Sequence, residues 1–347
     1  MKTVILIGSG HAHLEVLMKL SSAETLKHRF LLVSPQTKTF YSGFIPRFIA
    51  GEIDESSLSI ASADYARRKG VQFIQASMTS FDAKQKTVSL SNGRTLNFDI
   101  LSINVGSEPK QIPSRSPFNT IYPKPFDIFV QRWREVQRRF SACASIKFVV
   151  IGGGAAAVEI ATALRLRLDE NHSMKSEIHL VTSGARVCGS YSEKTSNAIL
   201  HSLVRNKIIV HLNESVAEIG DMQLALSDGK KLAFDEIIVA ASVRPGSYKT
   251  DDHLRIAPDV FAAGDVVDSD LPKSGVIAVH EGRYLGTMIQ HQLNGETSPS
   301  FHAPKRQINI LISGPRTAHL VWGKWSIEGR LPRLIKNWID SSYMRKW

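Results

Sequence analysis

The chain has 347 residues, of which 43% are apolar and 22% are charged, and its formal net charge is +11. This length allows two domains with separate cores, and the composition is that of an ordinary globular protein. No apolar run approaches the roughly 20 residues that span a bilayer, and the first residues predict a strand rather than a signal peptide. We therefore expect a cytoplasmic protein, which could still bind peripherally to the inner face of the cell membrane.

The basic charge has more than one explanation. No helix-turn-helix, zinc-finger or RNA-binding signature accompanies it, so we expect no nucleic acid partner. An anionic membrane surface is one alternative, and a simple solvated basic surface is another. The two cysteines, Cys143 and Cys188, do not form a redox pair of short spacing. We expect both to be free and to be buried as small apolar side chains.

The first part of the chain predicts the elements of a dinucleotide-binding domain: strand 3–8, helix 12–20, strand 30–33, strand 71–74, hairpin 87–96 and strand 98–106. A similar order then returns: helix 127–140, strand 147–151, helix 155–168, strand 177–181, hairpin 225–232 and strand 234–242. Such an internal repeat predicts two domains built on one plan. Lys124 falls at the crossing between them, where it could simply brace the connection.

The first strand ends in Gly8-Ser9-Gly10-His11-Ala12-His13, which follows the G-x-G-x-x-G/A pattern except at its last position. Gly8 permits a tight turn, Gly10 lets the backbone approach a pyrophosphate, and the helix N-terminus then faces the negative charge. The second strand ends in Ser34-Pro35 instead of the usual acid, and Ser34 could bind a ribose hydroxyl.

The second turn, Gly152-Gly153-Gly154-Ala155-Ala156-Ala157, fits the same pattern with a small residue at the packing position. Glu159, just inside the following helix, could face the nicotinamide. The next strand ends in Thr182 and lacks the acid that selects NADH, while Arg186 lies near enough in sequence to meet a 2′-phosphate or is simply solvated. We therefore expect NADH or NADPH, without a firm choice between them.

A third turn, Gly264-Asp265, follows the apolar run 260–262. A carboxylate at this place could accept hydrogen bonds from the ribityl hydroxyls of a flavin. Three such turns together predict FAD and NAD(P)H held face to face.

With the strand-end Gly106, these turns resemble the pyridine nucleotide-disulfide oxidoreductase superfamily. The size and layout are similar to type II NADH dehydrogenases, and residues 10–17, 32–35, 41–46 and 272–276 most closely resemble the flavoprotein domain fused to selenide, water dikinases. The resemblance implies that the isoalloxazine ring is bordered by Tyr41, Ser42, Lys273, Ser274, Gly275 and Val276. Lys273 would then stabilise the reduced flavin. Disulfide reductases carry their redox cysteines in the first of these regions, whereas residues 40–51 contain none.

Near the end of the chain, Leu331, Leu334, Ile335, Trp338 and Ile339 share one face of a helix. Cations and tryptophans surround them: Arg330, Arg333, Lys336, Arg345, Lys346, Trp322, Trp325 and Trp347. A basic amphipathic helix with tryptophan is typical of membrane-surface binding. The alternative is a helix that packs on its own domain or on the partner of a homodimer.

These observations predict an α/β fold with two Rossmann-like, three-layer ββα domains, the second inserted in the first. We expect an FAD domain at 1–115 and 245–295, an NAD(P)H domain at 116–244, and C-terminal strands with a helix at 296–347. The predicted function is hydride transfer from nicotinamide to flavin, followed by electron transfer to a quinone-like acceptor, without a redox disulfide. Alternatives are a reductase that serves selenium metabolism or a soluble acceptor, and a low-turnover redox sensor.

Lys273 and Glu159 are the catalytic candidates. The predicted cofactor ligands are Gly8, Gly10, His11, Ala12, Ser34, Pro35, Tyr41, Ser42, Gly106, Gly152, Gly154, Ala155, Ala156, Thr182, Arg186, Gly264, Asp265, Ser274, Gly275 and Val276.

Overall fold

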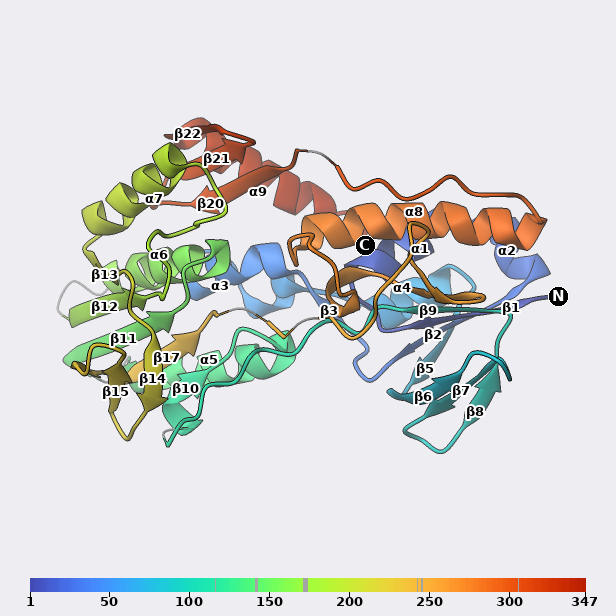
Figure 1. The fold of residues 1–347 in the computed structure, drawn as a ribbon, viewed down its shortest axis with the longest axis horizontal. Coiled ribbons are helices and arrows are strands. Elements are labelled where there is room, and N and C mark those ends of the chain that lie inside the picture. Colours follow the sequence, from blue (N-terminus) through green and yellow to red (C-terminus); the bar gives the residue numbers. More distant parts are fainter. Residues whose placement is uncertain (116, 141–142, 171–173, 242, 245, 305) are drawn as a thin grey trace.

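The computed structural model describes residues 1–347 except 116, 141–142, 171–173, 242, 245 and 305. Two lobes lie side by side, each built around a parallel sheet (Figure 1). The first sheet has the order β18-β19-β9-β1-β2-β5, and only β18 runs antiparallel to its neighbour. Its strands are β1 (Thr3–Ile7), β2 (Arg29–Ser34), β5 (Gln72–Gln75), β9 (Ile100–Ile103), β18 (Arg255–Ala257) and β19 (Val260–Ala262).

The second sheet has the order β10-β17-β11-β12-β13 and is wholly parallel. Its strands are β10 (Thr120–Ile121), β11 (Ser145–Ile151), β12 (Lys175–Val181), β13 (Ile208–His211) and β17 (Glu236–Val239). All five lie between β9 and β18 in the chain, so the second unit is inserted in the first, as predicted. The predicted boundaries at 116 and 245 lie outside the described residues, and the domain limits stay a prediction.

Each sheet has helices on one face and a small antiparallel sheet on the other, which confirms the predicted three layers. Strand side chains alternate between the faces. Val4 and Leu6 therefore pack with α1 and α8, while Ile5 and Ile7 pack with the small sheet. The first lobe contains α1 (His11–Lys19), α2 (Ser22–Lys27), α3 (Ile45–Ile49), α4 (Ser62–Arg68), α8 (Gly275–Asn294), β3 (Thr39–Phe40), β4 (Ser59–Ile60), β6 (Met78–Asp82), β7 (Thr87–Leu90) and β8 (Thr95–Asn97). The second contains α5 (Phe126–Phe140), α6 (Ala155–Asp169), α7 (Glu193–Arg205), β14 (Val216–Ile219), β15 (Gln223–Leu226) and β16 (Lys231–Ala233).

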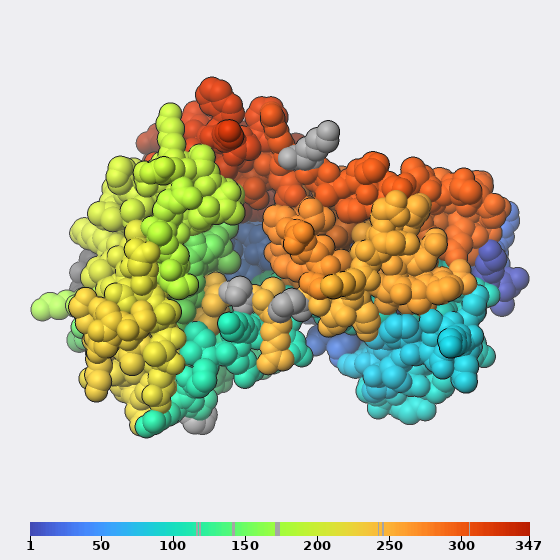
Figure 2. All heavy atoms as spheres, viewed as in Figure 1, coloured from blue at the N-terminus to red at the C-terminus, as the bar shows by residue number. Residues whose placement is uncertain are grey.

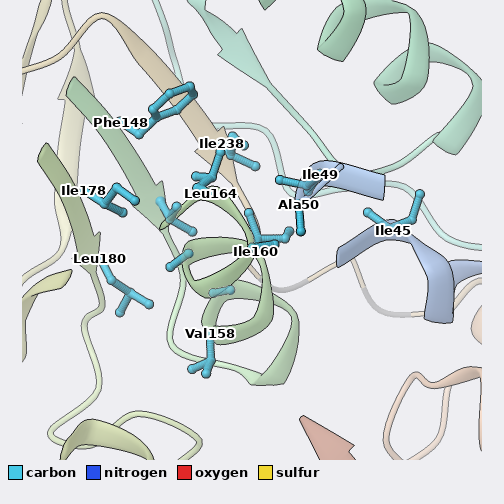
Figure 3. Packing of buried hydrophobic residues seen from close by; sticks show 14 of the residues in the cluster. Ile45, Ile49, Ala50, Phe148, Val158, Ile160, Leu164, Ile178, Leu180 and Ile238 are labelled. Carbon is cyan, nitrogen blue, oxygen red and sulfur yellow. The ribbon is translucent and has the colours of Figure 1, made fainter. Parts of the chain in front are cut away.

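The largest apolar cluster crosses from one lobe to the other. Ile45, Ile49 and Ala50, on and just after α3, pack in the same cluster as Ile160 of α6 (Figure 3). The space-filling view is hollowed between the lobes (Figure 2). The lobes are therefore joined by packed side chains as well as by their connecting segments.

A C-terminal unit lies across the top of the molecule (Figures 1 and 2). It consists of an antiparallel sheet, β20 (Ile308–Ile312), β21 (Ala318–Trp322) and β22 (Trp325–Gly329), and the helix α9 (Arg330–Met344). Short 3-10 turns lie at Ser42–Phe44, Glu55–Leu58, Pro117–Asn119 and Gly264–Val266. Within the described part of the chain, no helix is both long and apolar enough to cross a membrane.

Candidate functional site

The first glycine turn, between β1 and α1, packs directly against the end of β9. Gly8 has a φ of +88°, and a Cβ there would lie 2.2 Å from the carbonyl oxygen of Asn104. A Cβ at Gly10 would lie 2.3 Å from Asn104 Oδ1. The turn thus has no room for side chains, and α1 begins without a side-chain cap, so its N–H groups are free to bind an anion.

Asn104 joins the first turn to the third. Its Nδ2 donates to the carbonyl of Ala263 at 2.7 Å, and a Cβ at Gly264 would lie 2.4 Å from that nitrogen. The side chain is buried. Asn104 was not among the predicted site residues, although an amide at the end of a buried apolar strand is a usable signal.

The third turn is held from behind by Glu281 of α8. The backbone N–H of Gly264 donates to Glu281 Oε2 at 2.5 Å, and the glutamate side chain is buried. Burial raises the pKa of this carboxyl to about 7. Sequence reasoning missed Glu281, because its role depends on how α8 packs under the turn.

Asp265 lies on the open side of the same turn. Its Oδ2 forms an ion pair with Lys124 and accepts a hydrogen bond from Ser107 Oγ at 3.1 Å. Nothing lies within 4 Å of the position where a Cβ would stand on the neighbouring strand-end residue, Gly106. Asp265 is thus paired with Lys124, which belongs to the segment that leads into α5. The sequence did not predict this ion pair.

His11, Tyr41 and Ser42 come together between the starts of α1 and α8. His11 Nε2 is buried and has no hydrogen-bond partner among the described residues, and burial lowers the pKa of the ring to about 4. A Cβ built on Gly275 would lie 3.6 Å from Ser42 Oγ and 3.9 Å from His11 Nε2. Tyr41 lies 5.7 Å from His11, ring centre to ring centre, and its hydroxyl donates to Asp340 at 2.8 Å. A buried nitrogen without a partner is what a ligand site requires.

His13 stands at the sixth position of the first motif, where the pattern has Gly or Ala, and its role is structural. Its Nδ1 lies 2.6 Å from the carbonyl oxygen of Gly8 and its Nε2 lies 2.8 Å from Ser102 Oγ. The ring is fully buried. The imidazole therefore takes the place between helix and strand that a small residue normally leaves empty.

Other predicted residues of the first lobe have local partners. Lys273 Nζ donates to the carbonyl of Val267, and Ser274 Oγ accepts from the N–H of Ile277 as the cap of α8. Ser34 Oγ lies 3.1 Å from Ser9 Oγ. Three further predicted residues are placed as follows: Ala12 is buried, Pro35 is exposed and Val276 is 40% exposed.

The second glycine turn is more open. A Cβ at Gly152 would meet the carbonyl of Ala240 at 2.3 Å, but one at Gly154 would meet nothing within 4 Å. Thr182 Oγ1 accepts the N–H of Gly184 at 3.1 Å, and Arg186 is exposed. The predicted Ala155 and Ala156 form the first turn of α6, whose N-terminus also lacks a side-chain cap.

Cys188 lies beside this turn. Its N–H donates to the carbonyl of Gly153 at 2.6 Å, and burial raises the pKa of its thiol to about 12. Both cysteines are free, as expected, but Cys143 is exposed, so the expectation that it is buried was wrong. A protonated, buried thiol is a poor nucleophile, so Cys188 does not replace the missing redox pair.

The charged side of α9 faces inward, contrary to the expected arrangement. Lys336 Nζ lies 3.4 Å from Glu159 Oε1 and 3.8 Å from Asp340 Oδ2, and Arg333 forms an ion pair with Glu52. Glu159 also accepts the N–H of Ile312 at 3.0 Å. Two of the cations predicted for the surface of the helix, Arg333 and Lys336, are thus buried between the lobes, because acids from both lobes supply their partners.

The apolar side of α9 faces outward. Leu331, Leu334 and Trp338 are 67%, 64% and 67% exposed, and Trp325 and Ile327 on the preceding strand β22 are also exposed. We call these five residues the apolar face. Trp347, in contrast, packs on Tyr65 at 4.9 Å between ring centres and is not an outward aromatic.

Two uncapped helix starts, each preceded by a glycine turn at the end of a parallel strand, and a third turn beside the first define a two-dinucleotide oxidoreductase. The chain belongs to the pyridine nucleotide-disulphide oxidoreductase family, whose model matches residues 2–282. The predicted superfamily and fold class are therefore confirmed. The resemblance to the selenide, water dikinase fusion stays a prediction.

Among curated proteins, the chain is 24% identical to an NADH dehydrogenase-like protein of Mycobacterium tuberculosis, over 82% of this chain and 78% of that one. It is 22% identical to a type II NADH:quinone oxidoreductase of Staphylococcus haemolyticus, over 98% and 94%. Among solved structures, NDH2 from Plasmodium falciparum in complex with NADH matches with a TM-score of 0.86 at 13% identity, over 99% and 94%. The sulfide:quinone oxidoreductase of Aquifex aeolicus also gives 0.86, at 15% identity over 100% and 91%.

Proposed function

We propose that this protein is an FAD-dependent NAD(P)H oxidoreductase that passes electrons to a quinone drawn from a membrane, without a redox disulfide. FAD would be held by the first and third turns, with His11 Nε2, Ser42 and Asp265 facing it. The nicotinamide dinucleotide would be held by Gly152, Gly154 and the start of α6. Bound FAD would accept a hydride from the nicotinamide and release two electrons to the acceptor.

The apolar face is the observation that carries the quinone part of the proposal. Its large side chains are exposed on one side of α9, while Lys336 and Asp340 on the other side reach Glu159 and Tyr41. The same helix therefore contacts the candidate redox site and presents aromatic and aliphatic groups outward. Such a helix fits a membrane interface, where its apolar side is buried among lipid and a hydrophobic acceptor is available. The protein would then be cytoplasmic and bound peripherally to the cell membrane.

The alternative cysteine chemistry is disfavoured by position and protonation. The region beside Tyr41 and Ser42 contains no cysteine. Cys188 is buried beside the nicotinamide turn, and its raised pKa keeps it protonated. Electrons must therefore leave the flavin directly, which suits a small acceptor.

Anaerobic stopped-flow mixing tests the proposal. NADH or NADPH should bleach the bound flavin within seconds, and a short-chain quinone should restore its absorbance. Flavin that NADH and NADPH both leave oxidised would reject the oxidoreductase and favour the sensor. Flavin that is reduced but not reoxidised by any quinone would reject the acceptor.

Vesicle binding tests the membrane step. The double variant Leu334→Glu, Trp338→Glu should bind anionic phosphatidylglycerol vesicles at least tenfold more weakly, because it places two charges on the apolar face. Leu26→Glu is the matched control, since Leu26 is 84% exposed but lies on α2 of the first lobe. Equal binding by the double variant and the wild type would refute membrane docking through α9.

A further inference from the structure

Resting on the proposed FAD site, we infer that Lys124 is a flavin-site cation that offsets Asp265 and thereby raises the reduction potential of the bound flavin. Lys124 lies outside all three glycine turns. It belongs to the short segment between β10 and α5 of the second lobe. The second lobe would thus contribute a charge to the cofactor site of the first.

The geometry brings three chain segments to one point. Lys124 Nζ forms an ion pair with Asp265 Oδ2 and lies 3.5 Å from Ser107 Oγ, just beyond the end of β9. The Asp265 side chain is 15% exposed and that of Lys124 is 30% exposed, so the pair is partly screened from water. Both members of the pair also act on His11 at the start of α1: Asp265 raises the pKa of the ring and Lys124 lowers it.

Charge balance at the third turn gives Lys124 its role. Two carboxyls flank this turn, Asp265 on the open side and Glu281 behind it. Lys273 acts electrostatically on Glu281 and is hydrogen-bonded to Val267, whereas Lys124 is bound to Asp265. His11 adds no positive charge at neutral pH, because burial keeps its ring neutral.

A flavin that takes up a hydride gains two electrons and one proton, and so it gains one negative charge. A bare carboxylate close to the bound flavin would oppose that charge, and an ammonium on the carboxylate offsets the effect. Removing Lys124 therefore leaves Asp265 uncompensated and makes reduction harder. Lys84 is exposed on the turn between β6 and β7 of the first lobe, so its removal provides a matched loss of one positive charge.

The test measures the flavin itself in the full-length holoprotein. Lys124→Met should shift the ratio of reduced to oxidised flavin about tenfold towards the oxidised form at a fixed ambient potential. It should also weaken the flavin–sulfite adduct, which is anionic, by a similar factor. Lys124→Arg should restore both values to within about threefold, because the charge is kept.

Lys84→Met, which removes an exposed lysine between β6 and β7, is the control and should leave both values close to those of the wild type. An unchanged potential in Lys124→Met, or an equal loss in Lys84→Met, would overturn the inference. If Lys124→Met loses its flavin on purification, Lys124→Gln repeats the measurement with a polar side chain. Neither readout uses nicotinamide or quinone, so failure of the oxidoreductase proposal, seen as no flavin reduction by NAD(P)H in the wild type, is a separate outcome.

Discussion

The two nucleotide turns share a sequence pattern but differ in how closely the fold surrounds them. At the first, Gly8 and Gly10 have no room for a Cβ, because Asn104 fills the space behind both. At the second, Gly152 is equally close to the carbonyl of Ala240, but a Cβ on Gly154 would meet no described atom within 4 Å. The third turn and Glu281 close further around the first site, and no matching closure surrounds the second among the described residues. We infer that the first site is built for a resident cofactor and the second for a dinucleotide that exchanges.

The largest expected effect comes from filling the tight turn. Gly10→Ala should prevent flavin retention and lower the free energy of unfolding by about 3 kcal/mol, since its Cβ would stand 2.3 Å from Asn104 Oδ1. Gly154→Ala should cost about 1 kcal/mol or less, because space is available and only the helix start is affected. Flavin absorbance after gel filtration and urea denaturation measure the two effects. Similar losses in both variants would contradict the contrast between the turns.

Glu281 gives the next largest effect, and it depends on pH. Its pKa is about 7 in the folded protein against 4.5 for an ordinary glutamate, so the folded state binds the proton more tightly. This contribution to the free energy of unfolding is complete below about pH 4.5 and is lost as the pH rises through about 7, by about 3 kcal/mol in total. Glu281→Gln removes the titrating proton.

Urea denaturation of both cofactor-free proteins at about pH 5 and about pH 8 measures the difference. The wild type should lose more stability over this interval than Glu281→Gln does. Parallel losses in the two proteins would show that Glu281 titrates normally.

Asn104→Ala should have a smaller effect on stability, and it should weaken the binding of FAD. The substitution removes the donor to Ala263, so we expect about 2 kcal/mol of lost stability and about a tenfold rise in the FAD dissociation constant. Asn97→Ala, on an exposed strand end, serves as the control. Flavin fluorescence titration measures the affinity, and unchanged binding in Asn104→Ala would disprove its role between the turns.

The smallest effect is expected near the second glycine turn. Arg186 is exposed, so its removal should raise the KM for NADPH by about fivefold at most and leave that for NADH unchanged. Arg94→Ala, on the exposed hairpin of the first lobe, controls for the loss of one surface charge. Steady-state kinetics with both nucleotides provide the measurement. An equal rise in the KM for NADH would mean that Arg186 does not bind the 2′-phosphate of NADPH.

The glycine turns and the inserted second unit could be predicted because their signals are local. A buried strand, a glycine pair and a helix follow one another within a few residues of Gly8 and of Gly152. Asn104, Glu281 and Lys124 could not be placed in the same way. Each of them meets its partner only when segments distant in sequence pack together.

The orientation of α9 shows a different limit. Periodicity predicted an apolar and a charged side correctly, but the pattern is the same whichever side faces the protein. Which side is buried depended on Glu52 and Glu159, which lie far away in the sequence and accept Arg333 and Lys336.

The inward charges of α9 also bear on the order in which the chain folds. Burying Arg333, Lys336 and Asp340 without partners would be costly, and their partners come from both lobes. The helix therefore has no stable place until both lobes have formed and come together. We expect α9 to dock last, so that its buried ion pairs form, and its apolar side takes its final position, only on a molecule whose two lobes are already joined.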